Sequence, residues 1–122
     1  MQGLEIYEYD GEGYNATMHF ENWRVAFLHY AERFDRIDRL ERHLLTDEVF
    51  VLMKGRGVLF IGEEAKPVPM EWGKIYNVTK AVWHAIKVSE DAKVLIVENH
   101  NTSRDNSEYL PLDPALCSGY SL

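Results

Sequence analysis

The sequence has a single cysteine, Cys117, so no disulfide bond can form within the chain. It also has no uninterrupted apolar run that approaches the length of a membrane-spanning helix. The N-terminal stretch carries acids such as Glu5 and Glu8 and lacks the basic and then apolar pattern of a signal peptide. These absences predict a cytoplasmic protein with no membrane partner, whose fold depends on packing alone.

Positive charge is also scarce. The chain has 13 Lys and Arg against 20 Asp and Glu, which gives a formal net charge of -7 at pH 7. Nucleic-acid binding depends on an excess of Lys and Arg to neutralise phosphates. The densest basic stretch, residues 33–42, is interleaved with acids such as Asp35 and Asp38, so its charges compensate one another. We therefore expect no nucleic-acid partner.

A strong β-strand signal is present instead. The 122 residues are 46% hydrophobic, enough for one domain, residues 1–122, with a core of its own. Short β-branched or aromatic runs separated by turn residues predict an all-β sandwich or barrel, with a core at about residues 20–99. The runs are residues 49–54, 58–61, 74–78, 83–88 and 93–98. Alternation over residues 4–9 predicts an N-terminal edge strand, and the polar stretch after Asn99 predicts an irregular tail, residues 100–122.

The segment 32–45 allows two interpretations. Its apolar residues follow helical spacing, and acid–base pairs four residues apart accompany them, so periodicity alone predicts an amphipathic helix. In a helix, Glu41 and His43 would lie about 200° apart around the axis. In a strand they would lie on the same face. The helix would make His43 a surface residue, whereas the strand would let it share a site with Glu41.

Two histidines and one acid are candidate site residues. His43 and Glu48 come just before an apolar run that ends at Gly55, and His84 lies in a similar setting further along. Two imidazoles and a carboxylate that meet in one pocket can bind a transition metal. Without a metal, His84 would instead be a barrel-lining histidine that hydrogen-bonds to protein or water.

At these stretches the sequence resembles the cupin family of small β-barrels. The family's first motif reads G-x5-H-x-H-x3,4-E-x6-G, and its second reads G-x5-P-x-G-x2-H-x3-N. His43, Glu48 and Gly55 match the first motif in spacing, and Gly73 and His84 match the second. Five positions depart from the motifs. In the first motif, Asp35 replaces the leading glycine and Glu41 replaces the first histidine. In the second motif, Thr79 replaces the proline, Ala81 the second glycine and Val88 the asparagine.

The resemblance implies a double-stranded β-helix (jelly-roll) barrel with an irregular C-terminal tail. It places residues of about 39–43 in a strand, after a loop or short turn. It implies that His43, Glu48 and His84 bind a divalent transition metal, either Fe, Mn, Ni or Zn, and that the protein is a homodimer. Glu41 would be a fourth ligand or a general base beside the metal.

Strand alternation places Phe50 on the face of Glu48 and Ile86 on the face of His84, so both should line the pocket. Tyr76 and Trp83 are candidates for stacking against a substrate, or are packed aromatics. By resemblance we expect a small polar ligand, either sugar-like or an organic acid, and a metal-dependent isomerase or epimerase. The alternatives are a non-catalytic, metal-free ligand-binding or structural barrel and a metal-dependent dioxygenase.

Overall fold

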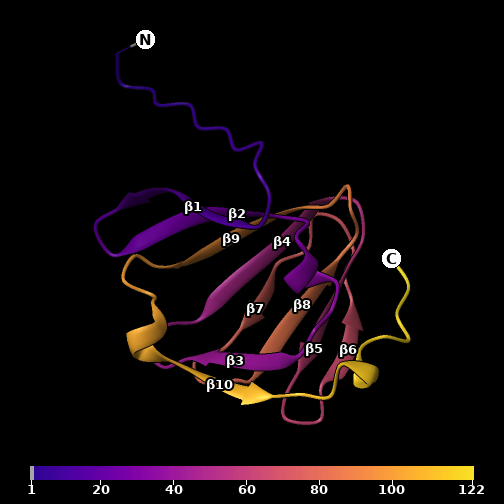
Figure 1. Cartoon of the computed structure of the whole chain (residues 1–122). Helices are drawn as coiled ribbons and strands as arrows, with labels where there is room; N and C mark the ends of the chain where they lie inside the picture. The colour runs from indigo at the N-terminus through magenta and orange to yellow at the C-terminus, as the bar shows by residue number, and fades with distance from the viewer. Residues whose placement is uncertain (1) are drawn as a thin grey trace.

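A computed structural model describes residues 2–122, which form two five-stranded antiparallel sheets (Figure 1). One sheet has the strand order β1-β2-β9-β4-β7, and the other has the order β10-β3-β8-β5-β6. The elements are β1 (Tyr14–Phe20), β2 (Trp23–His29), the 3-10 helix η1 (Glu32–Phe34), β3 (Arg39–His43), β4 (Glu48–Lys54), β5 (Gly57–Ile61), β6 (Lys66–Pro69), β7 (Tyr76–Val78), β8 (His84–Val88), β9 (Lys93–Asn99), η2 (Arg104–Asn106), β10 (Ser107–Pro111) and η3 (Pro114–Leu116).

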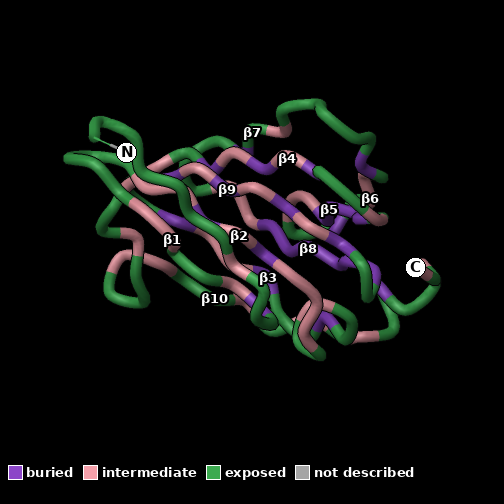
Figure 2. Tube along the Cα trace, turned by 90° about the horizontal axis from the view of Figure 1, so that it is seen from above, coloured by how far each residue is buried: buried purple, intermediate pink, exposed green. Residues whose placement is uncertain are grey.

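The two sheets face each other across a core, and β4 and β9 contribute to it by alternation. In β4 the inward residues Glu48, Phe50 and Leu52 are all buried, and the residues between them are half-buried. Strand β9 repeats the alternation of buried and half-buried residues (Figure 2). Val94 and Ile96 are almost fully buried. The all-β jelly-roll prediction is therefore confirmed, because two antiparallel sheets of this kind are what period-2 alternation builds.

Of the two interpretations of residues 32–45, the strand is correct. Only Glu32–Phe34 forms a helical turn, and Arg39–His43 is strand β3. β3 lies between β10 and β8: all five of its residues pair with β10, and Glu41 also pairs with His84 of β8. Leu40 is fully buried on one face of β3, and the cavity described below lies on the other. Tertiary pairing thus overrides the helical periodicity.

The prediction of an irregular tail is wrong for one stretch. Ser107–Pro111 is strand β10, which pairs antiparallel with β3 and places Ser107 opposite His43. The residues after it cover the outer face of the second sheet, where Cys117 is 1% exposed and Tyr120 packs against Phe60. This cover explains why all five residues of β8 are buried although β8 has only one face toward the core.

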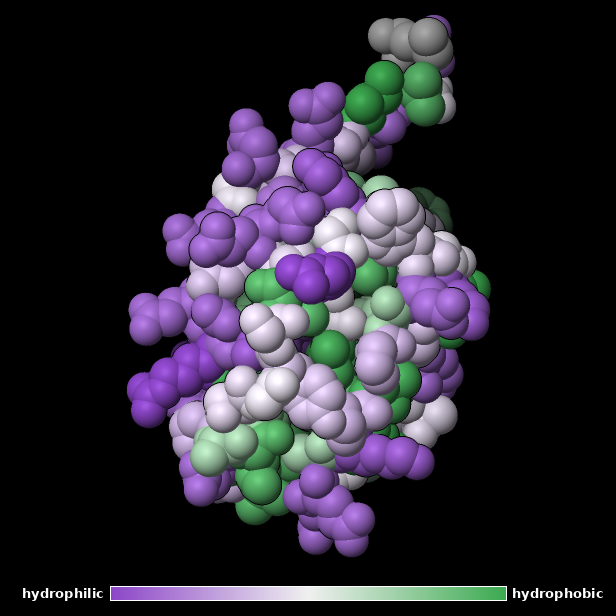
Figure 3. Space-filling view, turned by 90° about the vertical axis from the view of Figure 1, so that its right-hand side faces the viewer, coloured by the Kyte–Doolittle hydropathy of each residue, from purple (hydrophilic) through white to green (hydrophobic). Residues whose placement is uncertain are grey.

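The predicted strand over residues 4–9 is also wrong. These residues belong to no strand, and the first sheet begins at Tyr14. Leu4 and Ile6 are 51% and 80% exposed, and the segment projects beyond the body of the molecule (Figure 3). Alternation alone does not make a strand, because the segment also needs an edge to pair with. Within the described residues, no helix is long and apolar enough to cross a membrane.

Candidate metal centre

Three strands bring Glu41, His43, Glu48 and His84 to one place. β3 and β8 are neighbours, with Glu41 opposite His84, and β4 presents Glu48 from the facing sheet. The Nε2 atoms of His43 and His84 each lie 3.0 Å from Glu48 Oε1. Both also lie 3.9 Å from Glu41 Oε1. Two imidazoles from one sheet therefore converge on a single carboxylate oxygen from the other.

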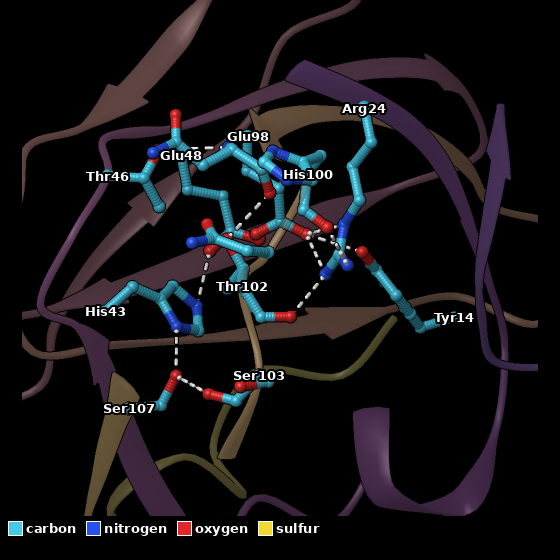
Figure 4. Close-up of polar contacts among 12 residues, drawn as sticks. Tyr14, Arg24, His43, Thr46, Glu48, Glu98, His100, Thr102, Ser103 and Ser107 are labelled. Carbon is cyan, nitrogen blue, oxygen red and sulfur yellow. Dashed lines mark hydrogen bonds and ion pairs between the residues drawn. The ribbon is translucent and has the colours of Figure 1, made fainter. Parts of the chain in front are cut away.

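The Nδ1 atoms of both rings form hydrogen bonds with groups other than Glu48. His84 Nδ1 lies 3.0 Å from the carbonyl oxygen of Val82, which can only accept, so this nitrogen carries a proton. His43 Nδ1 lies 2.8 Å from Ser107 Oγ (Figure 4). The Ser107 hydroxyl donates to the carbonyl oxygen of Ser103 at 2.7 Å, so its oxygen accepts from His43. Both neutral rings therefore present an Nε2 lone pair to Glu48.

Two lone pairs and a carboxylate oxygen cannot face one another unless protons or a cation lie between them. Burial opposes protonation of His43 and His84, but their hydrogen bonds to Glu48 prevail and raise the pKa of both rings. Burial likewise opposes ionisation of Glu48, yet the two imidazoles lower the pKa of its carboxyl to about 2. A divalent cation carries the same charge as the two bridging protons. These residues therefore fit a divalent transition metal.

Glu98 is a buried carboxylate that the sequence reasoning missed. The register of β4 with β9 places it beside Glu48 on the inner face. Its Oε1 accepts hydrogen bonds from the Tyr14 hydroxyl and from Arg24 Nη2, the latter at 3.0 Å. Burial and the neighbouring Glu48 raise the pKa of its carboxyl. The signal was its parity with Val94 and Ile96, which marks an acid on the inward face of a strand.

Glu98 Oε2 is buried and has no hydrogen-bond partner anywhere in residues 2–122. An unpaired buried acceptor costs about 1–3 kcal/mol. His43, Glu48 and Glu98 offer ligand atoms within 4.8 Å of one another, as do Glu41, His43 and His84. His43 therefore belongs to both groups of possible ligands.

These groups line one cavity of about 820 Å³ between the sheets. Phe50 and Ile86 line it, as expected, but Tyr76 and Trp83 do not, so the expectation for these two residues is corrected. Trp83 is adjacent to His84 in the chain and so faces the other way, where the Arg42 guanidinium lies 4.4 Å from its ring. Tyr76 is on the outer strand β7 and lines a separate cavity of about 300 Å³.

No protein-family profile and no curated protein matches the sequence. Solved structures do share its architecture. A cupin-2 domain protein from Shewanella frigidimarina has 18% identity and a TM-score of 0.60, over 75% of this chain and 85% of that one. An RmlC-like cupin with a double-stranded β-helix fold from Methanocaldococcus jannaschii has 14% identity and a TM-score of 0.62, over 81% and 93%. This chain has the cupin fold.

A third cupin-fold neighbour is Streptomyces Pac13, described as a nucleoside dehydratase and solved with uridine. The uridine complex has 9% identity to this chain and a TM-score of 0.65, over 89% of this chain and 88% of that one. At these identities the likeness concerns the cupin fold alone.

The hydrogen bond from His43 to Ser107 gives a first prediction for this cupin-fold site. Ser107→Ala removes the acceptor that holds the His43 ring, so we expect metal affinity to fall about 10–100-fold. Ser118→Ala is the matched control, because its hydroxyl also bonds a backbone carbonyl, that of Ala115, but in the tail. Titration with zinc and a competing chelator measures both. Equal affinities in the two variants would contradict the assigned role of Ser107.

Proposed function

We propose that this cupin-fold protein binds one divalent transition metal through His43, Glu48 and His84, and that it isomerises or epimerises a small polar organic compound in the adjoining cavity. The supporting observation is the approach of both Nε2 atoms to Glu48 Oε1 at 3.0 Å. Two imidazoles and one carboxylate leave coordination positions open and suit Fe, Mn, Ni or Zn. When bound, the metal would polarise an oxygen of the substrate.

Glu41 is the proposed base. Its side chain is 39% exposed, against 7% for Glu48, and it lines the cavity. A carboxylate that is reached from the cavity and lies 3.9 Å from each Nε2 can take a proton from a bound ligand. Glu41→Gln should then keep its metal and lose exchange of substrate protons with deuterated water. Loss of the metal in this variant would make Glu41 a ligand instead.

The test of the metal is direct. The protein is purified without added metal, analysed for transition metals, and analysed again after loading with Fe, Mn, Ni or Zn and removal of excess. We expect roughly one equivalent of metal per chain after loading. Less than roughly a tenth of an equivalent for every metal would remove the metalloenzyme proposal and leave the metal-free barrel, in which Glu48 pairs with two imidazolium rings.

The reaction class is tested on the loaded protein. Pac13 was solved with uridine, a hydroxylated polar molecule, which supports the choice of sugar-like compounds as first candidates. Proton exchange at a carbon of the substrate, followed by NMR in deuterated water, would support isomerisation or epimerisation. Oxygen consumption without such exchange would favour a dioxygenase. Binding with neither would favour a non-catalytic ligand-binding protein.

We also propose that the protein forms a homodimer through the projecting N-terminal segment. Leu4 and Ile6 are exposed on it, and the outer edge of β1 is unpaired within residues 2–122. Such an edge can accept an extended segment from a second copy. Light scattering after size exclusion should show a dimer that the double variant Leu4→Ser, Ile6→Ser dissociates. Leu45→Ser, at a residue exposed to 53%, should not do so. A monomeric wild-type protein would overturn the proposal.

A further inference from the structure

Glu98 is held rigidly while one of its oxygens is left unbound. Tyr14 and Arg24 both donate to Oε1, and Arg24 is itself fixed by the carbonyl oxygens of His100, at 3.2 Å, and Thr102, at 3.0 Å (Figure 4). The residue is 5% exposed and lines the cavity. Its Oε2 has no partner in the part of the chain that the structure describes. A rigid, buried and unpartnered oxygen on a residue that lines a cavity is complementary to a polar group of a ligand.

A hydroxyl group is the best match for this oxygen. A hydroxyl can donate to Oε2 when Glu98 is ionised and can accept from it when Glu98 is protonated. An apolar ligand atom in the same place would leave Oε2 unsatisfied. The inner end of the cavity therefore selects compounds that carry at least one hydroxyl.

The rim of the same cavity carries three arginines, Arg33, Arg39 and Arg104. Within residues 2–122 none of the three forms an ion pair, although the protein carries a net charge of -7. Arg33 lies over the Phe34 ring at 4.3 Å, and Arg39 lies over the Tyr109 ring at 4.4 Å. Stacking restricts the two guanidinium groups without using their hydrogen-bond donors.

Unpaired guanidinium groups bind carboxylates and phosphates, which accept two parallel hydrogen bonds. Asp38, Glu41 and Glu48 also line this cavity and oppose an anion, but none of them forms an ion pair with these arginines in the described chain. The cavity thus has an acceptor at its inner end and unpaired cations at its rim.

We propose that the cavity binds a small hydroxylated organic anion, with a hydroxyl on Glu98 Oε2 and the acidic group on the rim arginines. This assignment rests on the proposed function in that it names the substrate class for the same site. It makes Glu98 a ligand-binding residue rather than only a partner of Arg24. It also favours acids over neutral sugars among the candidates.

Three probes separate the two contacts. Gluconate has hydroxyls and a carboxylate, hexanoate has only the carboxylate, and sorbitol has only hydroxyls. Calorimetry on the zinc-loaded protein should show gluconate binding at least about tenfold more tightly than either of the others. Glucose 6-phosphate is the fourth probe, and tighter binding than gluconate would assign a phosphate as the anion. Equal affinity for gluconate, hexanoate and sorbitol, or no binding of any probe, would overturn the proposal.

Variants then assign each contact. Glu98→Gln should weaken gluconate at least about tenfold and leave hexanoate unchanged. Arg39→Gln should weaken both anions, whereas Arg56→Gln, an exposed arginine outside the cavity, should weaken neither. If Glu98 only supports Arg24, Glu98→Gln will weaken gluconate and hexanoate alike, which contradicts the proposal. If this variant does not fold, the wild-type ranking of the probes decides.

A repeat on chelator-treated protein separates this inference from the proposed metal function. Preference for gluconate that persists without metal supports the hydroxyl and arginine contacts even if no metal proves to be bound. A protein that binds metal but shows no preference would overturn this inference and leave the metal proposal standing.

Discussion

Replacing His84 by alanine is expected to abolish stoichiometric metal binding and to weaken zinc affinity at least about 100-fold. His84 is 2% exposed, its Nδ1 is fixed by Val82, and its Nε2 points at Glu48. The variant removes one of two imidazole donors, and the donors that remain beside His43 and Glu48 are the carboxylates Glu41 and Glu98. We expect this loss to exceed the effect of removing a supporting residue, which is about 10–100-fold. Metal content after loading and dialysis measures the change.

Thermal unfolding gives a second measurement of the same variant. Zinc at 100 times its dissociation constant stabilises a folded protein by about 2.7 kcal/mol. The wild-type protein should therefore unfold at a higher temperature with zinc, and His84→Ala should not respond. His19→Ala is the control, because His19 is exposed on β1 and should leave both results unchanged. A zinc response that survives in His84→Ala would show that the metal binds elsewhere.

A folding defect in His84→Ala is a separate expectation. Without metal, Glu48 would keep only one imidazole partner in a buried setting, and breaking such a pair costs about 3–5 kcal/mol. His84→Gln keeps a polar side chain of similar length and is the variant of choice if alanine unfolds the protein. It should still fail to bind stoichiometric zinc, because an amide is a poor ligand for zinc compared with an imidazole.

The strands could be predicted from sequence where alternation and pairing agree, as in β4 and β9. The resemblance to the cupin motifs also identified strand β3 against the helical periodicity of this segment. Residues 4–9 alternate equally well yet form no strand, since pairing depends on an edge that the sequence of the segment does not describe. Local pattern therefore predicts which residues can form a strand, and only the fold decides whether they do.

The candidate site could likewise be predicted only in part from the sequence. His43, Glu48 and His84 were chosen from motif spacing, and the structure brings them within hydrogen-bonding distance. Trp83 could have been excluded by parity with His84. Glu98 could have been suspected from its parity on β9, but its neighbours Tyr14 and Arg24 are 84 and 74 residues away in the chain, so the network around it could not be anticipated.

Metal affinity should depend strongly on pH. His43 and His84 have pKa values raised above 6.5 in the metal-free protein. Well below pH 6.5 both rings are therefore mostly charged, and a metal must displace a proton from each Nε2. We expect release of about two protons per metal at pH 6, so that affinity rises by up to about 100-fold per pH unit. Calorimetry in buffers of different ionisation enthalpy counts the protons.

The histidine contribution to the stability of the metal-free protein should instead fall as pH rises. A group with a raised pKa stabilises the fold below its unfolded value, and this contribution is lost as pH rises through the folded value. The imidazolium pair thus stabilises the metal-free protein below pH 6.5 and fades above it, while Glu48, with a pKa of about 2, loses its contribution as pH falls below 4.5. Metal should therefore stabilise the protein most at pH 8, where the protons no longer compete. Proton release near zero at pH 6 would show that neither Nε2 atom carries a proton in the metal-free protein, and would contradict the pairing of Glu48 with two imidazolium rings.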